Sequence, residues 1–441
     1  RFETPEAVLA FSSEGFNGLS RCMHDFVNRH IIPKAWQFKE RPVLYNSWEG
    51  CGFDFDEARL LSLAGQAKAL GCELFVLDDG WFGKRCSDTA GLGDYNVNLE
   101  RLPSGLKGLS DKLRSLGLDF GLWFEPESVN PNSDLYRSHP DWIQQDRLPP
   151  LLGRHQLLLD LGKPEVRDYI VENVSTILDE ADVRYVKWDM NRYSTLLGAR
   201  THLHILGLYD VLRRIFGPRP HVLLESCSSG GNRFDLGMLC FSPQIWASDN
   251  TDPIERIDIQ EGLSLLYPQS AMGAHVSAAP HCQTMRVTPL STRAHVSFFG
   301  ILGYEFDLNH LTDTQRNEIR KQIGFYKENR RLFQFGSFHR MKTEYGTGWQ
   351  VSLEDQHIVG LFHRLIPASP GYESISLQGL DLHKKYRAAF ALREETNSIL
   401  CSGAALKAGW ILPPLFCGTG NLAESRNHAD FGSDLLKIEG L

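Results

Sequence analysis

The sequence predicts an α/β fold, a (β/α)8 TIM barrel followed by a small C-terminal antiparallel β-sandwich domain. Three observations support this fold class. The chain of 441 residues is long enough for two domains. Short apolar runs alternate with amphipathic helical patterns over roughly two thirds of the chain, which indicates a parallel sheet. Beyond about Gly336 the apolar residues recur with the period of two that is typical of antiparallel strands.

The repeat begins after an amphipathic helix that is expected at residues 14–30. A helix that starts at Asp56 carries leucines and alanines on one face and ends at Gly71, and another starts at Pro164. No glycine-rich nucleotide-binding turn follows the first strand, which favours a barrel over an open, doubly wound sheet. The eight barrel strands are expected at residues 43–46, 73–77, 118–124, 156–161, 185–188, 221–225, 244–247 and 272–276.

Three segments are predicted along the chain. Residues 1–35 are expected to be the tail of an absent N-terminal β-domain with a connecting helix, because residues 2–11 look like a strand that needs a partner sheet. Residues 36–334 form the barrel, and residues 335–441 form the all-β domain. The strands of that domain are expected at residues 349–353, 357–363, 372–377, 386–392 and 435–438.

Composition excludes several classes of function. The net charge of -8 and a pI of about 6.1 argue against a nucleic-acid partner or an anionic membrane surface. No apolar run of about 18 residues is present, so no transmembrane helix is expected. The nine cysteines form no Cys-x-x-Cys pair, which argues against a zinc site or a disulfide framework. We therefore expect a cytoplasmic protein with reduced thiols and with no metal or organic cofactor.

Acidic and tryptophan side chains recur where the expected strands end. The carboxyl ends of barrel strands form the active face of this fold, so these side chains are expected to converge. Indole rings pack on sugar C–H faces, and two carboxylates across a sugar ring can cleave a glycosidic bond. The sequence therefore favours a carbohydrate-active site. The residues at strand ends are Trp48, Asp78, Asp79, Trp123, Glu125, Lys187, Asp189, Glu225, Cys227, Asp249 and Asp252.

The pair Lys187 and Asp189 is the strongest local signal. Side chains alternate along a strand, so these two point the same way while Trp188 faces the helices. A neighbouring ammonium favours the ionised carboxylate, which makes Asp189 a candidate nucleophile. The alternative is a structural ion pair, which is the commoner role of such an arrangement.

Each of the other signals also has a structural interpretation. The pair Asp78–Asp79 is suited to capping the turn that follows it, and Asp252 is suited to capping a helix. The run from Cys227 to Gly231 is also consistent with a plain turn of small residues. His275 and His281 are interpreted as structural rather than metal-binding, because no suitably spaced set of ligands accompanies them.

Five motifs together resemble glycoside hydrolase family 36, the α-galactosidases, and they occur in the order found in that family. The resemblance extends from about Phe2 to the C-terminus. The motifs are Leu-Asp-Asp-Gly-Trp-Phe at 77–82, Gly-Leu-Trp-Phe-Glu-Pro-Glu at 121–127, Lys-Trp-Asp-Met-Asn at 187–191, Glu-Ser-Cys-Ser-Ser-Gly-Gly at 225–231 and Ser-Asp-Asn-Thr-Asp at 248–252.

The resemblance implies a retaining exo-α-galactosidase that removes terminal α-linked galactose from oligosaccharides such as melibiose and raffinose. Asp189 would be the nucleophile and Asp249 the acid/base, and a retaining enzyme places two such carboxyls about 5 to 5.5 Å apart. Asp249 should be the less paired of the two, with a raised pKa. The resemblance assigns the sugar 4- and 6-hydroxyls to Asp78 and Asp79, further sugar contacts to Lys187, Arg154 and Asn191, the 2-hydroxyl pocket to Cys227 and Gly230, and the walls to Trp48 and Trp123.

One departure from the family pattern is visible. The run Gln283-Thr284-Met285-Arg286 stands where the family suggests Gln-Thr-Gly-Arg, which places a change on the aglycone side of the site. The resemblance also implies a homo-oligomer if the upstream domain is present.

Four alternatives remain open at this stage. A galactosyltransferase of the raffinose-synthase type would use the same two acids, and an α-N-acetylgalactosaminidase would need more room at the sugar 2-position. A magnesium-dependent lyase of the enolase type would bind metal with Asp79, Glu125 and Asp189 and would lose activity with a chelator. A non-catalytic sugar-binding module would not require both Asp189 and Asp249.

Overall fold

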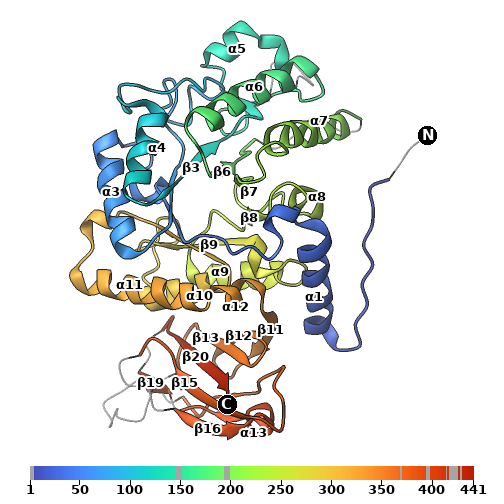
Figure 1. Ribbon diagram of the computed structural model, residues 1–441, viewed down its shortest axis with the longest axis vertical. Helices are drawn as coiled ribbons and strands as arrows, with labels where there is room; N and C mark the ends of the chain where they lie inside the picture. The colour runs from blue at the N-terminus through green and yellow to red at the C-terminus, as the bar shows by residue number, and fades with distance from the viewer. Residues whose placement is uncertain are drawn as a thin grey trace.

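The computed structural model describes residues 4–144, 151–192, 199–367, 370–393, 398–413, 415–416, 426–427 and 430–441. Its centre is a closed barrel of parallel strands (Figure 1), so the predicted fold class is confirmed. Around the barrel the strands follow the order β1-β10-β9-β8-β7-β6-β3-β2. They are β1 (Leu44–Asn46), β2 (Leu74–Leu77), β3 (Asp119–Phe124), β6 (Tyr185–Trp188), β7 (Leu223–Ser226), β8 (Gln244–Trp246), β9 (Met272–Ser277) and β10 (Ile301–Glu305).

Helices follow the strands and cover the outside of the barrel (Figure 1). Helix α3 shows why one forms where predicted: Asp56 caps it by accepting from the Arg59 N–H at 2.8 Å, and Gly71 ends it with a φ of 111°. The helices of this part are α1 (Gly15–Phe26), α2 (Trp48–Cys51), α3 (Glu57–Leu70), α4 (Gly105–Ser115), α5 (Asp134–Ser138), α6 (Pro164–Glu180), α7 (Ala199–Phe216), α8 (Leu236–Leu239), α9 (Pro253–Leu263), α10 (Leu290–Phe298), α11 (Asp313–Glu328) and α12 (Arg330–Phe335).

Short helical turns complete the barrel region. A π-helical turn, Val27–Ile31, extends α1, and 3-10 turns lie at Lys34–Trp36, Pro140–Trp142, Gln269–Ala271 and Leu308–His310. No helix in the described part of the chain is long and apolar enough to cross a membrane.

The prediction of the barrel strands was wrong at two places. The run at 156–161 is not a barrel strand: its β5 (Leu157–Leu158) pairs antiparallel with β4 (Ser128–Val129) outside the barrel. The eighth strand is instead β10, which closes the barrel by pairing with β1 and β9. The buried leucines of the short antiparallel strand β5 give the same apolar signal as a short barrel strand, and Gly303 interrupts the signal of β10.

Gly303 has a packing reason. A Cβ at this position would lie 2.3 Å from the His275 ring carbon Cδ2, so only glycine leaves room for the buried imidazole on the neighbouring strand β9.

The predicted strand at residues 2–11 is not observed in residues 4–11, which carry no regular structure. This segment runs extended along one side of the molecule (Figure 1). It exposes Leu9 and Phe11.

The C-terminal part is an antiparallel sheet of six strands in the order β11-β12-β13-β20-β15-β16. A smaller layer with α13 covers one face, because Ile375 and Leu406 share a core with Val359 of β13. The elements are β11 (Ser337–Lys342), β12 (Gly346–Leu353), β13 (Gln356–His363), β14 (Ser374–Ile375), β15 (Lys385–Phe390), β16 (Ile399–Ser402), α13 (Gly403–Ala408), β17 (Trp410–Ile411), β18 (Leu415–Phe416), β19 (Arg426–Asn427) and β20 (Ser433–Gly440).

The other face of this sheet packs on the barrel through aromatic side chains. Phe299, after α10, lies 5.5 Å from the Trp349 ring and 6.0 Å from the Phe362 ring, centroid to centroid. It also contacts Phe333 of α12 and Phe338 of β11. These side chains belong to the same core as the barrel interior, so the C-terminal sheet is an integral part of the barrel's support.

Replacing Phe299 by alanine is expected to lower the free energy of unfolding by about 3–5 kcal/mol, because a buried aromatic side chain is lost from a packed interface. Urea denaturation followed by tryptophan fluorescence measures the change. Phe16→Ala is the matched control, since Phe16 is 74% exposed. An equal effect of both substitutions would contradict the proposed importance of this interface.

Candidate active site

A pocket of about 300 Å³ opens at the carboxyl ends of the barrel strands, where this fold places its active sites. Of the residues predicted from the sequence, nine line it: Trp48, Asp78, Asp79, Trp123, Arg154, Lys187, Asp189, Asn191 and Asp249. The lining also includes Glu49, Arg85, Gln156, Trp246, Thr251, Cys282 and Glu305, which were not predicted as site residues, and Gln283 of the run that was expected on the aglycone side.

A larger cavity, of about 530 Å³, lies at the opposite end of the barrel, beside Leu74, Phe120 and Tyr185 near the start of their strands. Its charged side chains are engaged with one another, as in the ion pair between Arg114 and Asp182. Residues at this end of a barrel serve stability rather than chemistry, so we place the site in the smaller pocket.

Asp78 is the direct partner of Lys187. Its Oδ2 accepts hydrogen bonds from Lys187 Nζ at 2.9 Å and from Asn46 Nδ2 at 2.8 Å. Although burial disfavours the charged amine, Asp78 and other acidic groups raise the pKa of Lys187 well above its ordinary value. The alternative that Lys187 and Asp189 form a structural ion pair is therefore corrected, because Lys187 pairs with Asp78. Strand alternation places Lys187 and Asp189 on one face, but the long lysine side chain extends past β3 to Asp78, which follows β2.

Asp79 is held by a residue that sequence reasoning missed. Arg85 donates to it through Nε at 3.0 Å and through Nη2 at 2.7 Å, and both side chains are almost fully buried. Burial raises the pKa of Asp79, and the guanidinium opposes that effect. This bidentate contact fixes the orientation of the carboxylate at the pocket floor.

Asp189 accepts hydrogen bonds at both carboxyl oxygens. Its Oδ1 accepts from the Met190 N–H at 2.8 Å, and its Oδ2 accepts from Asn191 Nδ2 at 2.8 Å and from Trp123 Nε1 at 3.3 Å. Arg154 in turn donates to Asn191 Oδ1 at 2.5 Å. Donors at both oxygens fix the orientation of this carboxylate in the pocket.

Asp249 has a poorer set of donors. Trp246 Nε1 donates to its Oδ1 at 3.0 Å, and the Cys227 thiol lies 4.0 Å from the same oxygen. Burial and the nearby charge of Asp189 raise the pKa of Asp249. The predicted direction of this shift is confirmed. The two acids thus differ in environment: Asp189 accepts from three N–H donors, whereas Asp249 accepts from one and has a raised pKa.

Cys227 and Gly230 lie behind the pocket wall rather than in its lining. A Cβ on Gly230, whose φ is 88°, would lie 2.8 Å from the Ser248 Cα and 2.9 Å from the Asp249 nitrogen. Glycine therefore allows the two loops to touch, and the backbone of Asp249 rests on it. The predicted contacts of Cys227 and Gly230 with a sugar stay a prediction.

Three further carboxyl groups near the pocket have raised pKa values. Burial, followed by the charge of Asp189, raises the pKa of Glu125. Burial raises the pKa of Glu49 to about 8, with Glu305 as the next cause, and burial raises that of Glu305 to about 8. Glu305 ends β10 and lies 2.7 Å from His275 Nδ1. Because β10 was not predicted, neither was Glu305.

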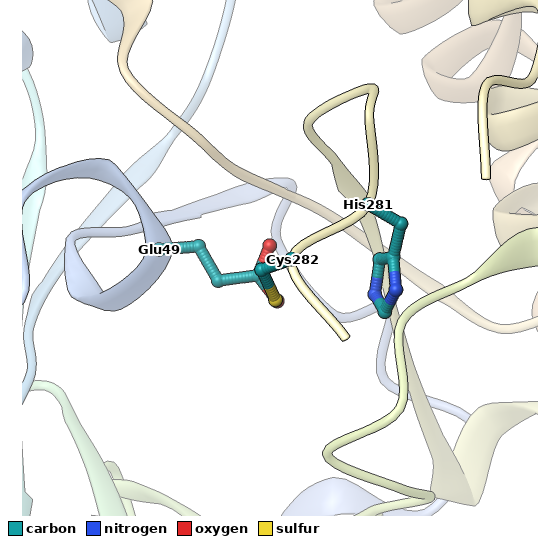
Figure 2. A group of neighbouring side chains, drawn as sticks. All are labelled: Glu49, His281 and Cys282. Carbon is teal, nitrogen blue, oxygen red and sulfur yellow. The ribbon is translucent and has the colours of Figure 1, made fainter. Parts of the chain in front are cut away.

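Within the described residues, one group offers three donor atoms of the kinds that bind metals: Glu49, His281 and Cys282, all within 4.8 Å of one another (Figure 2). The hydrogen bonds argue against metal binding. His281 Nδ1 faces the backbone N–H groups of Gln283 and Thr284, at 3.4 and 3.2 Å, so the proton of a neutral ring lies on Nε2. Nε2 lies 2.9 Å from Thr251 Oγ1 and donates to it. That the site needs no metal stays a prediction.

A family model described as Melibiase matches residues 1–336. The chain belongs to the melibiase family.

Relatives and solved structures agree with this assignment. This chain is 46% identical over 401 residues to the α-galactosidase AgaA of Geobacillus stearothermophilus, and 42% identical over 401 residues to an α-galactosidase of Lactobacillus acidophilus. These matches cover 87% and 88% of this chain but 55% of each relative. The chain thus spans little more than half the length of the curated relatives.

Among solved structures, a variant of AgaA in complex with raffinose matches with a TM-score of 0.88 at 41% identity, covering 97% of this chain and 59% of that one. Another AgaA variant, in complex with stachyose, matches with a TM-score of 0.89 at 42% identity, covering 98% and 60%. Both are described as α-galactosidases of glycoside hydrolase family 36, so the resemblance expected from the five motifs is confirmed.

Arg85→Met is expected to lower the free energy of unfolding by about 3–5 kcal/mol, because it leaves the buried Asp79 without its ion-pair partner. Thermal and urea unfolding measure the loss. Arg114→Met is the matched control: its ion pair with Asp182 is largely exposed and is worth at most about 1 kcal/mol. A loss of the same small size in Arg85→Met would show that Asp79 does not depend on the guanidinium.

Proposed function

We propose that this chain is a retaining exo-α-galactosidase that hydrolyses terminal α-linked galactose from oligosaccharides such as melibiose and raffinose. The observation that carries the proposal is the contrast between two acids in one pocket, Asp189 and Asp249. A retaining glycosidase needs one carboxylate as nucleophile and one protonated carboxyl as acid. The relatives named as α-galactosidases, and the solved complexes with raffinose and stachyose, support galactose as the sugar.

In the first step, the Asp189 carboxylate attacks the anomeric carbon while Asp249 gives its proton to the departing glycosidic oxygen. This forms a galactosyl-enzyme ester and frees the rest of the oligosaccharide. In the second step, Asp249 takes a proton from water, and the water oxygen displaces Asp189 from the anomeric carbon. Two inversions return the α configuration.

The remaining pocket residues bind and orient the sugar in this proposal. Asp78 and Asp79, neutralised by Lys187 and Arg85, accept from the 4- and 6-hydroxyls, so that an equatorial 4-hydroxyl would leave a buried acceptor without its partner. Trp48 offers an apolar wall. The acceptor side is formed by loops such as the one that carries Cys282 and Gln283.

We also propose that the chain divides into an N-terminal segment, residues 1–35, a catalytic barrel, residues 36–334, and a C-terminal domain, residues 335–441.

We further propose that the protein is cytoplasmic, which is supported by free thiols at all eight cysteines of the described part of the chain. Homo-oligomerisation, if an upstream domain is present, is part of the same proposal.

Asp189→Ala is expected to lower turnover of p-nitrophenyl α-galactoside by roughly 10³-fold or more, because the nucleophile is lost. Added azide should restore release of p-nitrophenol and yield β-galactosyl azide, which NMR identifies. In Asp249→Ala, azide should instead yield the α-azide, since the covalent intermediate still forms. A β-azide from Asp249→Ala and an α-azide from Asp189→Ala would reverse the two roles.

The pH profile of kcat/KM tests the role of Asp249 as acid. Because its pKa is raised, the protonated form persists above the ordinary range of an aspartic acid, and activity falls as pH rises through that pKa. Measurement with melibiose should show this basic limb. In Asp249→Asn the residual activity on an activated aryl galactoside should lose the limb. A basic limb that is unchanged in Asp249→Asn would assign the acid to another group.

A further inference from the structure

Building on the proposed function, we propose that Glu49, Thr251 and His281 form a hydrogen-bonded clamp that positions Asp249 for proton transfer. Asp249 and Thr251 share the loop after β8. Glu49 stands on α2 after β1, and His281 stands on the loop after β9 (Figure 2). The clamp thus ties the acid-bearing loop to the loops of two other strands.

The direction of each hydrogen bond follows from the chemistry of the groups. His281 Nδ1 faces backbone N–H groups and therefore accepts, which leaves the ring proton on Nε2. Nε2 donates to Thr251 Oγ1 at 2.9 Å, and the hydroxyl then donates its single proton to Glu49 Oε1 at 2.8 Å. Burial lowers the pKa of His281, which agrees with a neutral ring. Both hydrogen bonds of the clamp therefore run in one direction, from His281 through Thr251 to Glu49.

Asp249 depends on its backbone for its position. Its carboxyl receives one strong hydrogen bond, from Trp246, so the side chain is held weakly compared with Asp189. The loop itself is fixed from two sides. Arg256 donates to the Ser248 carbonyl at 2.8 Å and to the Asn250 carbonyl at 2.9 Å. The clamp holds the loop at the Thr251 side chain, one residue after Asn250 and two residues beyond the acid.

Removal of the clamp should affect proton donation more than sugar binding. A displacement of about 1 Å of a catalytic group costs roughly 10²-fold in rate. Proton donation matters most when the leaving group is a poor one, such as the glucose of melibiose, and least for 2,4-dinitrophenolate, which departs without an acid. The ratio of kcat/KM values on these two substrates therefore reports on the position of Asp249.

The experiment compares four variants with the wild type on melibiose and on 2,4-dinitrophenyl α-galactoside. Thr251→Val removes the hydroxyl at nearly constant shape, and Thr251→Ser restores it. His281→Ala breaks the clamp behind the pocket wall, where the side chain does not line the pocket. Thr292→Val is the matched control, since Thr292 is equally buried but its hydroxyl bonds to Phe431 and Ser433 in the C-terminal part.

We expect Thr251→Val and His281→Ala to lose roughly 10- to 100-fold on melibiose and less than about 3-fold on the dinitrophenyl substrate. Thr251→Ser and Thr292→Val should behave like the wild type. Equal losses on both substrates would overturn the proposal. A loss in Thr251→Val without a loss in His281→Ala would also overturn it, because it would indicate direct contact between Thr251 and the substrate.

Hydrogen–deuterium exchange of the peptide that covers residues 247–254 gives a second readout. Exchange should be faster in Thr251→Val and His281→Ala than in the wild type and in Thr292→Val. If the wild type turns over neither galactoside, the proposed function fails, and the exchange rates still decide whether the clamp exists. Unchanged exchange in both clamp variants would refute it.

Discussion

The site depends on keeping several acidic side chains stable after they have been taken out of water. Burying a charge is costly unless a partner and hydrogen bonds compensate it, so each carboxyl group discussed here either is compensated by a cation or by several N–H donors, or has a raised pKa. Lys187 and Arg85 neutralise the acids that follow β2. Glu49 and Glu305, with pKa values raised to about 8, belong to the second class. The cations are thus structural requirements as well as candidate sugar ligands.

The same balance separates the two acids that we propose as catalytic. Asp189 receives three hydrogen bonds from N–H donors, whereas Asp249 receives one and lies within the field of Asp189. The difference comes from the neighbouring elements: Asp189 is beside β3, whose Trp123 donates to it, whereas Asp249 lies on the backbone of Gly230 and 4.0 Å from the weakly donating Cys227 thiol. Both residues are aspartic acids, so their different proposed roles follow from their different surroundings.

Strand-end position was enough to find Asp78, Asp79, Asp189 and Asp249, because the barrel brings all its carboxyl-terminal ends together. Pairing between them was not predictable from local pattern. Alternation fixes the face of Lys187 but not its partner, which is distant in sequence. Arg85 could not be predicted as a partner of Asp79, because the two residues are joined by an irregular loop, in which side chains follow no periodic pattern. Glu305 was missed together with β10. Gly303 weakens the apolar pattern of that strand, and the reason for this glycine is the packing of His275 on the neighbouring strand.

The pairing of β1 with β10 makes the first and last strands of the barrel neighbours, and the pocket spans that seam. Glu49 stands on one side of it and Glu305 on the other. During synthesis, a chain that has not yet released Glu305 from the ribosome lacks one wall of the pocket, however well its earlier strands have paired. A complete pocket therefore forms only after the last barrel strand has been synthesised and has paired with the first.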